Sequence, residues 1–246
     1  MHEILADVVA EQQAVDQFLQ LIPERDWDEA TPKSGGSIRQ HVAILASGEE
    51  LAHNAIAGGG SMLGEARDYA TLDDYLATAS KPGAKRRTQE IIEWWRRARA
   101  AVIDDLSRTN PSQKIPWVGG GLRARTFAIG RLTDTWVHGL DIHATFDSEP
   151  EDTDRLRHIA WLGWETLPSA VAAAGEANAE AVRAELIGPN YGKWIYGSVE
   201  ADSVVRGRAG EWCRLTVGRL PAKAATSLKA EGEAAEIALR VAAGSL

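Results

Sequence analysis

The chain has 246 residues, of which 44% are hydrophobic and 25% charged, as is typical of a globular protein with a sizeable buried core. The formal charge of -8 argues against nucleic-acid binding. The single cysteine, Cys213, excludes an internal disulfide framework and a multi-cysteine zinc site. No apolar run approaches the roughly 18 residues of a membrane span, and acidic residues occupy the N-terminus where a signal peptide is basic. We therefore expect a cytoplasmic protein that binds neither membranes nor nucleic acids.

Apolar residues recur at helical spacing through the first two thirds of the chain. Ser37-Ile38-Arg39-Gln40 matches a capping box, in which the Ser37 side chain caps a new helix and Gln40 reaches back. Three consecutive glycines, starting at Gly58, end that helix. Helices are predicted over about residues 2–22, 37–56, 72–79, 85–107, 123–146 and 152–174.

The pattern changes near residue 180. Val182, Ala184 and Leu186 alternate with polar residues, which is typical of a strand. Further short strands are predicted at 193–196, 203–206 and 227–230, and helices at 210–217 and 233–243. The sequence predicts an α+β protein, with a helical bundle over residues 1–177 and a small α+β domain over residues 178–246.

Histidines are the first candidates for chemistry. Asp134 and His138 are four residues apart on a predicted helix and lie about 40° apart on one face. Such a pair can bind a divalent ion, act as an acid–base dyad, or simply hydrogen-bond to itself. His41, near the start of the second long helix, can add a third group from a facing helix or pack within the bundle. His158 lies beside arginines and is expected on a solvated face.

Trp117 precedes Gly119-Gly120-Gly121, and we interpret it as a candidate pocket wall. The glycines allow the loop to move over a cavity as a lid, or they form a plain flexible connection. Trp136 shares a helix face with Leu132 and is expected in the core. Cys213 is expected to be buried in an amphipathic helix rather than to be a reactive thiol.

Three stretches resemble a known family. Trp117 is followed by ARTF at 124–127 and RLTDTWVHGLD at 131–141, which is similar to the signature of the mycothiol-dependent maleylpyruvate isomerase family, part of the DinB-like metalloenzyme superfamily. Residues 31–45 resemble that family's stretch TP-x-x-GW[ST][VI]R-x-x-VAHL. The segment from Gly210 to Arg219 resembles its small sterol-carrier-like domain.

The resemblance implies a four-helix bundle that holds a divalent metal, usually zinc, and uses mycothiol as cosubstrate. Metal coordination deprotonates a thiol, and the family's chemistry is thiol addition to electrophilic carbons. The implied ligands are the histidine of the AHL stretch and a Glu-x-x-x-His pair. An arginine that Arg219 matches is implied to bind a substrate carboxylate.

This chain departs from the family at the implied ligands. Asp134 replaces the glutamate, whereas His138 is kept. Ile44 replaces the AHL histidine, and Gly36 replaces the tryptophan of the GW pair. His41 lies about 60° round the helix from Ile44 and roughly 4–5 Å away along its axis, so it is a candidate displaced ligand for zinc or another divalent metal.

Three functions remain open for a chain with this ligand set. The first is a metal-free isomerase or cyclase for a small electrophilic or polyketide-like substrate. The second is an ordinary metal- and mycothiol-dependent isomerase or S-transferase with His41 as ligand. The third is a non-catalytic protein that sequesters a small molecule. The sequence does not indicate an oligomeric state.

In the metal-free case, specific residues carry the expected roles. Asp134 and His138 form the acid–base dyad, and His41 and Asp141 are further proton carriers. The pocket is expected to be lined by Ile44 and Trp117, opened by Gly36 and thus suited to a larger and more apolar ligand.

Overall fold

A computed structural model describes residues 1–33, 35–176 and 182–246. The chain divides into two compact units, residues 1–150 and 151–246. None of the helices in these described ranges is both long and apolar enough to cross a membrane.

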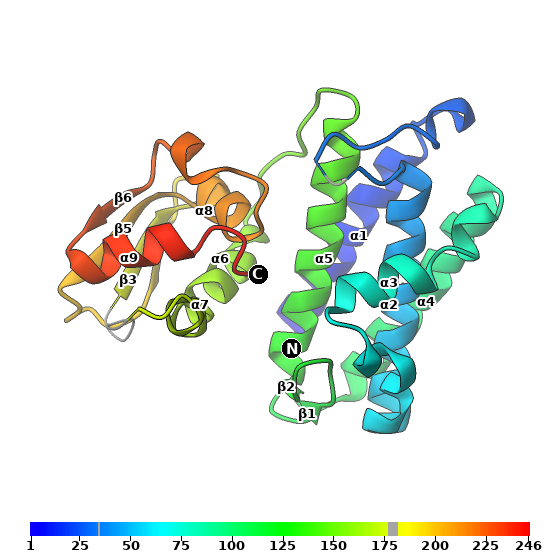
Figure 1. Ribbon diagram of the computed structural model, residues 1–246, viewed down its shortest axis with the longest axis horizontal. Helices are drawn as coiled ribbons and strands as arrows, with labels where there is room; N and C mark the ends of the chain where they lie inside the picture. The colour runs from blue at the N-terminus through cyan, green and yellow to red at the C-terminus, as the bar shows by residue number, and fades with distance from the viewer. Residues whose placement is uncertain (34, 177–181) are drawn as a thin grey trace. The chain divides into compact units, whose positions relative to one another are not determined.

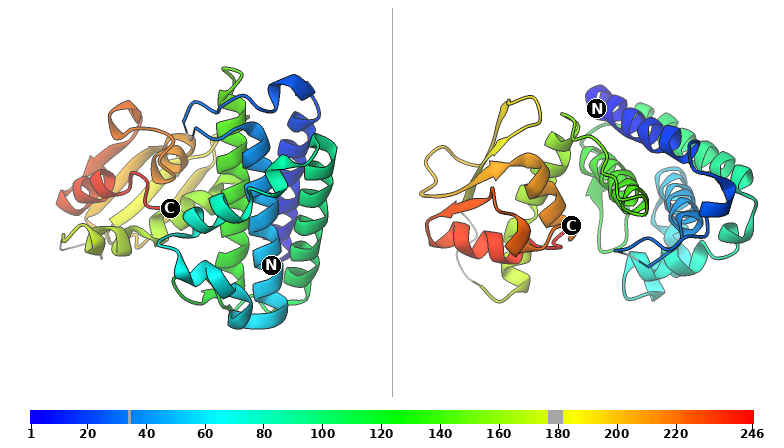
Figure 2. Two further views of the ribbon diagram at one scale, coloured as in Figure 1. Left: turned by 45° about the vertical axis from the view of Figure 1, so that its right-hand side comes forward. Right: turned by 90° about the horizontal axis from the view of Figure 1, so that it is seen from above.

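The first unit is a bundle of four long helices that run side by side (Figures 1 and 2). These are α1 (His2–Leu19), α2 (Ile38–Gly58), α4 (Thr88–Arg108) and α5 (Ala124–Ala144). The shorter α3 (Leu72–Ala79) and the 3-10 segments Glu24–Asp26, Gly59–Asp68 and Gly83–Lys85 lie in the connections. The predicted helices are confirmed to within a few residues, because the apolar spacing marks the faces that pack together.

The start of α2 is set by the predicted capping box. The Ser37 side chain accepts a hydrogen bond from the backbone N–H of Gln40, and Gln40 Oε1 accepts one from the backbone N–H of Ser37 at 2.8 Å. Both bonds satisfy donors that a helix N-terminus leaves unpaired. They also fix the turn that presents His41, one residue further along.

The glycine-rich connection before α5 is a small hairpin. Its strands β1 (Lys114–Ile115) and β2 (Leu122–Arg123) pair antiparallel. Trp117 and Gly120 exchange two backbone hydrogen bonds of 3.1 Å each. Gly119 and Gly120 have φ of 82° and 139°, which glycine adopts without strain. The connection is therefore a hydrogen-bonded turn between two short strands.

The second unit combines helices with a four-stranded sheet. Helices α6 (Leu156–Glu165) and α7 (Leu167–Ala173) precede the sheet, whose strand order is β4-β3-β5-β6. The strands are β3 (Val182–Ile187), β4 (Lys193–Tyr196), β5 (Ser203–Arg208) and β6 (Lys229–Glu231). Strands β3 and β5 are parallel, and the other pairings are antiparallel. Helix α8 (Ala209–Thr216), the 3-10 turn Ala222–Ala224 and α9 (Glu233–Val241) complete the unit.

The division between the units lies at residues 150/151, not at the expected 177/178. Helix α6 packs against α8, where Trp212 Nε1 donates to the carbonyl of Ala160 at 3.0 Å. Trp164 Nε1 donates to the carbonyl of Val182 at 2.8 Å and so ties α6 to the sheet. His158 is only 5% exposed, so its predicted solvated position was also wrong. Helical periodicity identified α6 as a helix, but it does not say which core the helix joins.

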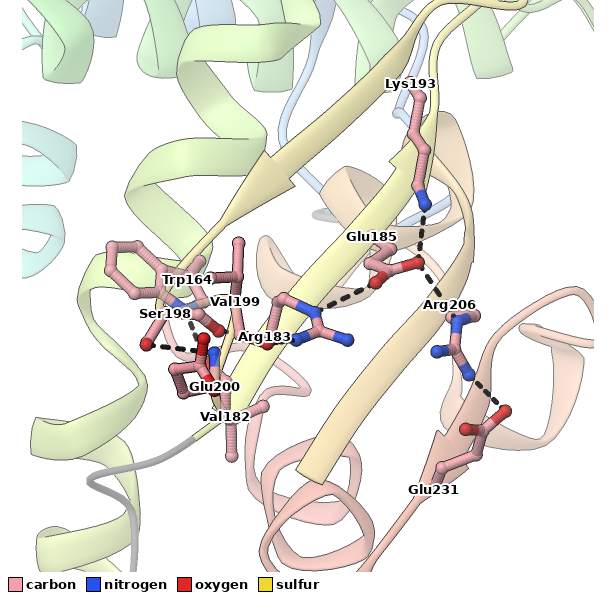
Figure 3. Close-up of polar contacts among 10 residues, drawn as sticks. All are labelled: Trp164, Val182, Arg183, Glu185, Lys193, Ser198, Val199, Glu200, Arg206 and Glu231. Atoms are coloured by element: carbon pink, nitrogen blue, oxygen red, sulfur yellow. Dashed lines mark hydrogen bonds and ion pairs between the residues drawn. The ribbon is translucent and has the colours of Figure 1, made fainter. Parts of the chain in front are cut away.

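The sheet has one buried face and one charged face. Val182, Ala184 and Leu186 alternate with Arg183 and Glu185 along β3. On the charged face, shown in Figure 3, Glu185 pairs with Lys193, Arg206 and Arg183 at 2.8, 3.1 and 2.9 Å. Hydrogen bonds from Lys193 and then Arg206 lower the pKa of the Glu185 carboxyl to about 2. This face carries ion pairs rather than apolar packing.

Candidate functional site

Two histidines from facing helices meet inside the first unit. His41, on the first turns of α2, is 3% exposed, and its Nδ1 lies 2.6 Å from Nδ1 of His138 on α5. The two rings are inclined by 71°, with centroids 4.9 Å apart. Because two unprotonated ring nitrogens would repel one another, a contact this short requires a proton between them.

Thr31 fixes the other side of the His41 ring. Its Oγ1 lies 2.9 Å from His41 Nε2, and Thr31 is buried. The loop around it is closed by a hydrogen bond of 2.8 Å from the Thr31 N–H to the Gly36 carbonyl. A Cβ on Gly36 would stand 3.7 Å from His41 Nε2. Gly36 therefore lies beside Nε2 of His41. The sequence had suggested instead that Gly36 opens the pocket.

Asp134 lies one turn before His138, but its carboxylate belongs to an ion pair with Arg131. The Asp134 side chain is 43% exposed, whereas Arg131 is buried. The guanidinium carbon of Arg131 lies 5.2 Å from the Trp117 ring and 5.6 Å from the Phe127 ring. His138 also meets His41, so the site joins side chains from two helices as well as from two turns of α5.

A cavity of about 50 Å³ adjoins these groups. It has an apolar side from α2 and α3 and a charged side from α5, and its lining consists of Ile44, Leu45, Gly48, Leu72, Asp73, Leu76, Arg131, Asp134 and His138. Ile44, His138 and Asp134 are thus brought to one cavity, as the sequence suggested. Its volume is on the order of one or two water molecules.

The remaining predicted residues are not among those that line this cavity. Trp117 packs edge-on against Phe127, with ring centroids 4.9 Å apart. Asp141 is completely buried within α5. Arg219 belongs to the second unit, where its Nη1 donates to the carbonyl of Val217 at 3.2 Å. Cys213 is completely buried, as predicted, and burial raises the pKa of its thiol.

Glu49 on α2 is a buried acidic residue that was not predicted from the sequence. This glutamate is 1% exposed, and its Oε2 has no hydrogen-bond partner in the described part of the chain. Burial raises the pKa of its carboxyl to about 7, against the attraction of Arg131. Its spacing from Leu45 and Ala52, both buried on the same helix, was the signal that could have identified it.

The donor set does not fit a three-ligand divalent metal. Two nitrogens on one tetrahedral zinc lie about 3.3 Å apart, since each Zn–N bond is about 2.0–2.1 Å, whereas the His41 and His138 nitrogens are 2.6 Å apart. Ile44 offers no lone pair, so the position of the AHL histidine supplies no ligand. Within the described ranges, no three His, Cys, Asp or Glu residues gather closely enough for a metal ion.

Comparison with known proteins agrees with this architecture. Two solved structures, of the mycothiol-dependent maleylpyruvate isomerase and of a point mutant of it, match with TM-scores of 0.62 and 0.60. Each match covers 93% of this chain and 92% of the other, at 17% and 16% identity, and therefore shows a shared fold. An uncharacterized protein of Mycobacterium tuberculosis, present in two strains, is 29% identical over 242 residues, which are 97% of this chain and 93% of the relative.

The family assignment rests on the bundle itself. Residues 8–143 match the family model described as the mycothiol maleylpyruvate isomerase N-terminal domain, and this range includes α2, α4, most of α1 and nearly all of α5. The matched range contains both histidines, Asp134 and the cavity. The chain therefore belongs to the mycothiol maleylpyruvate isomerase family.

Proposed function

We propose that the protein isomerises or cyclises a small electrophilic substrate by acid–base chemistry at the His41–His138 pair. The single observation that carries the proposal is the 2.6 Å contact between the two Nδ1 atoms, one of them on a residue that lines the cavity. An imidazole titrates near neutral pH and is the commonest general acid or base. A second imidazole that shares its proton supplies a relay.

One assignment of protons satisfies the three groups of this network. His41 donates through Nε2–H to Thr31 Oγ1, and His138 donates through Nδ1–H to His41 Nδ1. The Nε2 of His138 is then the basic atom of the pair. When it takes a proton from the substrate, the Nδ1 proton moves to His41, and the reverse transfer returns a proton to another substrate atom. Such an isomerisation balances without an oxidant or reductant.

The cavity lining suggests how the substrate is held. Ile44 and the α3 leucines favour an apolar portion, and Arg131 and Asp134 face a polar one. In this proposal Asp141, on the same helix as His138, is a further proton carrier. The family's mycothiol is the candidate cosubstrate, which suits the reducing cytoplasm expected for this chain.

Maleylpyruvate, offered with and without mycothiol, is the first substrate to test. Turnover is followed by the change in ultraviolet absorption, for the wild type and for His138→Ala, His41→Ala and His53→Ala. His53 is the matched control, because it lies on the same helix as His41 with a side chain that is 42% exposed. Loss of a general base lowers the rate by about 10²- to 10⁴-fold. We expect that loss for His138→Ala and His41→Ala, and activity within about twofold of wild type for His53→Ala.

Metal analysis of protein purified without chelator separates the alternatives. About one equivalent of zinc or another divalent ion that is lost in His138→Ala would replace this proposal with a metal- and thiol-dependent reaction in which His41 is a displaced ligand. Tight binding without turnover of any substrate of this class would indicate a sequestering protein. Full activity of His138→Ala would contradict all acid–base roles given to the pair.

A further inference from the structure

Arg131 is a buried cation with one hydrogen-bonding atom to spare. Its Nη2 pairs with Asp134, whereas its Nε is buried and has no partner in the described ranges. A Cβ on Gly48 would lie 3.4 Å from Arg131 Nη1, so the glycine leaves room for the guanidinium beside α2. The side chain therefore lies between the cavity and the interior of the bundle.

Glu49, the next residue of α2, offers the complementary atom. It is 1% exposed, and its Oε2 is buried and unpaired among the described residues. Arg131 is the cation that attracts it most strongly. An unused N–H donor and an unused carboxylate oxygen thus lie on two adjacent helices in the same low-dielectric interior, where each is costly to leave unpaired.

Two other polar side chains lie near the Glu49 carboxylate, and they differ from Arg131 in the N–H groups that they can offer it. Arg99, on α4, already donates through Nη1 to the Gln12 carbonyl at 2.7 Å and through Nη2 to Asp16 at 2.5 Å. Gln12, on α1, lies beside Glu49, but its Nε2 has no hydrogen-bond partner in the described part of the chain. Of the two neighbouring arginines, Arg131 is therefore the one with an unengaged N–H.

We infer that Arg131 exchanges between two carboxylates, Asp134 at the cavity and Glu49 in the interior, and that Glu49 is thereby a positioning residue for Asp134. When Arg131 turns to Glu49, the Asp134 carboxylate is released toward the cavity and becomes available to a ligand or to His138. When Arg131 returns, that carboxylate is neutralised. Exchange is favoured over simple release, because a buried cation without a partner is strongly destabilising.

The charge of Glu49 makes both states accessible. Burial raises the pKa of its carboxyl to about 7, so the ionised and protonated forms coexist near neutral pH. The ionised form competes for Arg131, and the protonated form leaves it to Asp134. The inference rests on the proposed function, because it supplies a carboxylate to the cavity that His138 lines, but it can be tested without any substrate.

A double-mutant cycle tests the exchange. The variants are Glu49→Gln, Asp134→Asn and their combination, with melting temperature as the readout. The melts are run at pH 8, where Glu49 is ionised, so each single variant leaves Arg131 one carboxylate. The combination leaves a buried cation unpaired, and we expect its loss to exceed the sum of the single losses by about 4 °C or more.

The matched control is Glu50→Gln. Glu50 is adjacent on the same helix but accepts a hydrogen bond from Trp94 Nε1 at 2.6 Å. Its loss should add to that of Asp134→Asn without excess. Additive losses for Glu49→Gln and Asp134→Asn as well would overturn the exchange.

A spectroscopic readout covers the case in which the double variant does not fold. The Nε–Hε signal of Arg131 is assigned by its absence in Arg131→Lys. In Asp134→Asn we expect this proton to exchange with solvent more slowly than in the wild type, because Arg131 is then held by Glu49. An unchanged exchange rate would overturn the inference, whereas a failure to find catalysis would not affect either measurement.

Discussion

Two glutamates, one in each unit, have pKa values that are shifted in opposite directions. Glu49 is buried in the bundle with an unpaired oxygen, and its pKa rises to about 7. Glu185 lies on the charged face of the sheet among Lys193, Arg206 and Arg183, and its pKa falls to about 2. Loss of solvation governs the first carboxyl and nearby cations govern the second. Ionisation of Glu49 therefore destabilises the folded bundle, whereas ionisation of Glu185 stabilises the folded sheet domain.

Removal of the buried cation, Arg131, should have the largest effect on the stability of the bundle. Arg131→Met leaves Asp134 and Glu49 without it, and we expect the free energy of unfolding to fall by about 3–5 kcal/mol. The control Arg108→Met removes a side chain that is 64% exposed, and its effect should be within about 1 kcal/mol. Denaturant titration of both variants measures the difference. If both variants lose the same free energy of unfolding, the Arg131–Asp134 ion pair contributes no more than an exposed one.

The pH dependence of stability should have opposite signs at the two glutamates. Because the pKa of Glu49 is raised in the folded state, its contribution is fully present below pH 4.5 and is lost as the pH rises to about 7. The shift of about 2.5 pKa units corresponds to about 3 kcal/mol. Thermal melts between pH 4 and 8 should therefore show a decline in stability that is absent in Glu49→Gln.

The capping box offers a smaller test within the bundle. Ser37→Ala removes the side-chain acceptor for the Gln40 N–H and should cost about 1 kcal/mol of stability. It should also loosen the first turn of α2 and so weaken the His41–His138 contact, which imidazole nitrogen shifts would report. The matched control is Arg208→Ala in the second unit, since Arg208 makes no side-chain cap to α8. A loss for Arg208→Ala as large as that for Ser37→Ala would contradict a specific capping effect.

The smallest effect is expected on the sheet. Glu185→Gln removes a carboxylate whose partners Lys193 and Arg206 are 52% and 40% exposed, so the melting temperature at neutral pH should change little. Its contribution is present above pH 4.5 and is lost as the pH falls toward 2, the reverse of Glu49. High salt should remove whatever difference remains at neutral pH. A large loss that is insensitive to salt would show that the Glu185 network is structural.

Local sequence determined much of this protein. The spacing of apolar residues identified the long helices, and the Ser37–Gln40 pattern placed the start of α2 within one residue. Alternation at Val182, Ala184 and Leu186 identified β3. These features depend on neighbours within a few residues, so they can be read without knowing the rest of the fold. The motif around Asp134 and His138 also pointed to the family to which the chain belongs.

Tertiary structure decided the rest, because it depends on residues far apart in the chain. The contact of His41 with His138 spans 97 positions, and helical spacing alone favoured Asp134 as the partner of His138. The side chains of α6 look equally helical in either unit, and only their packing against α8 assigns them to the second. Glu49 resembles an ordinary helix glutamate until burial removes its solvent. Whether a polar side chain is paired, buried or exposed depends on which helices pack together. That packing depends on apolar contacts throughout the core.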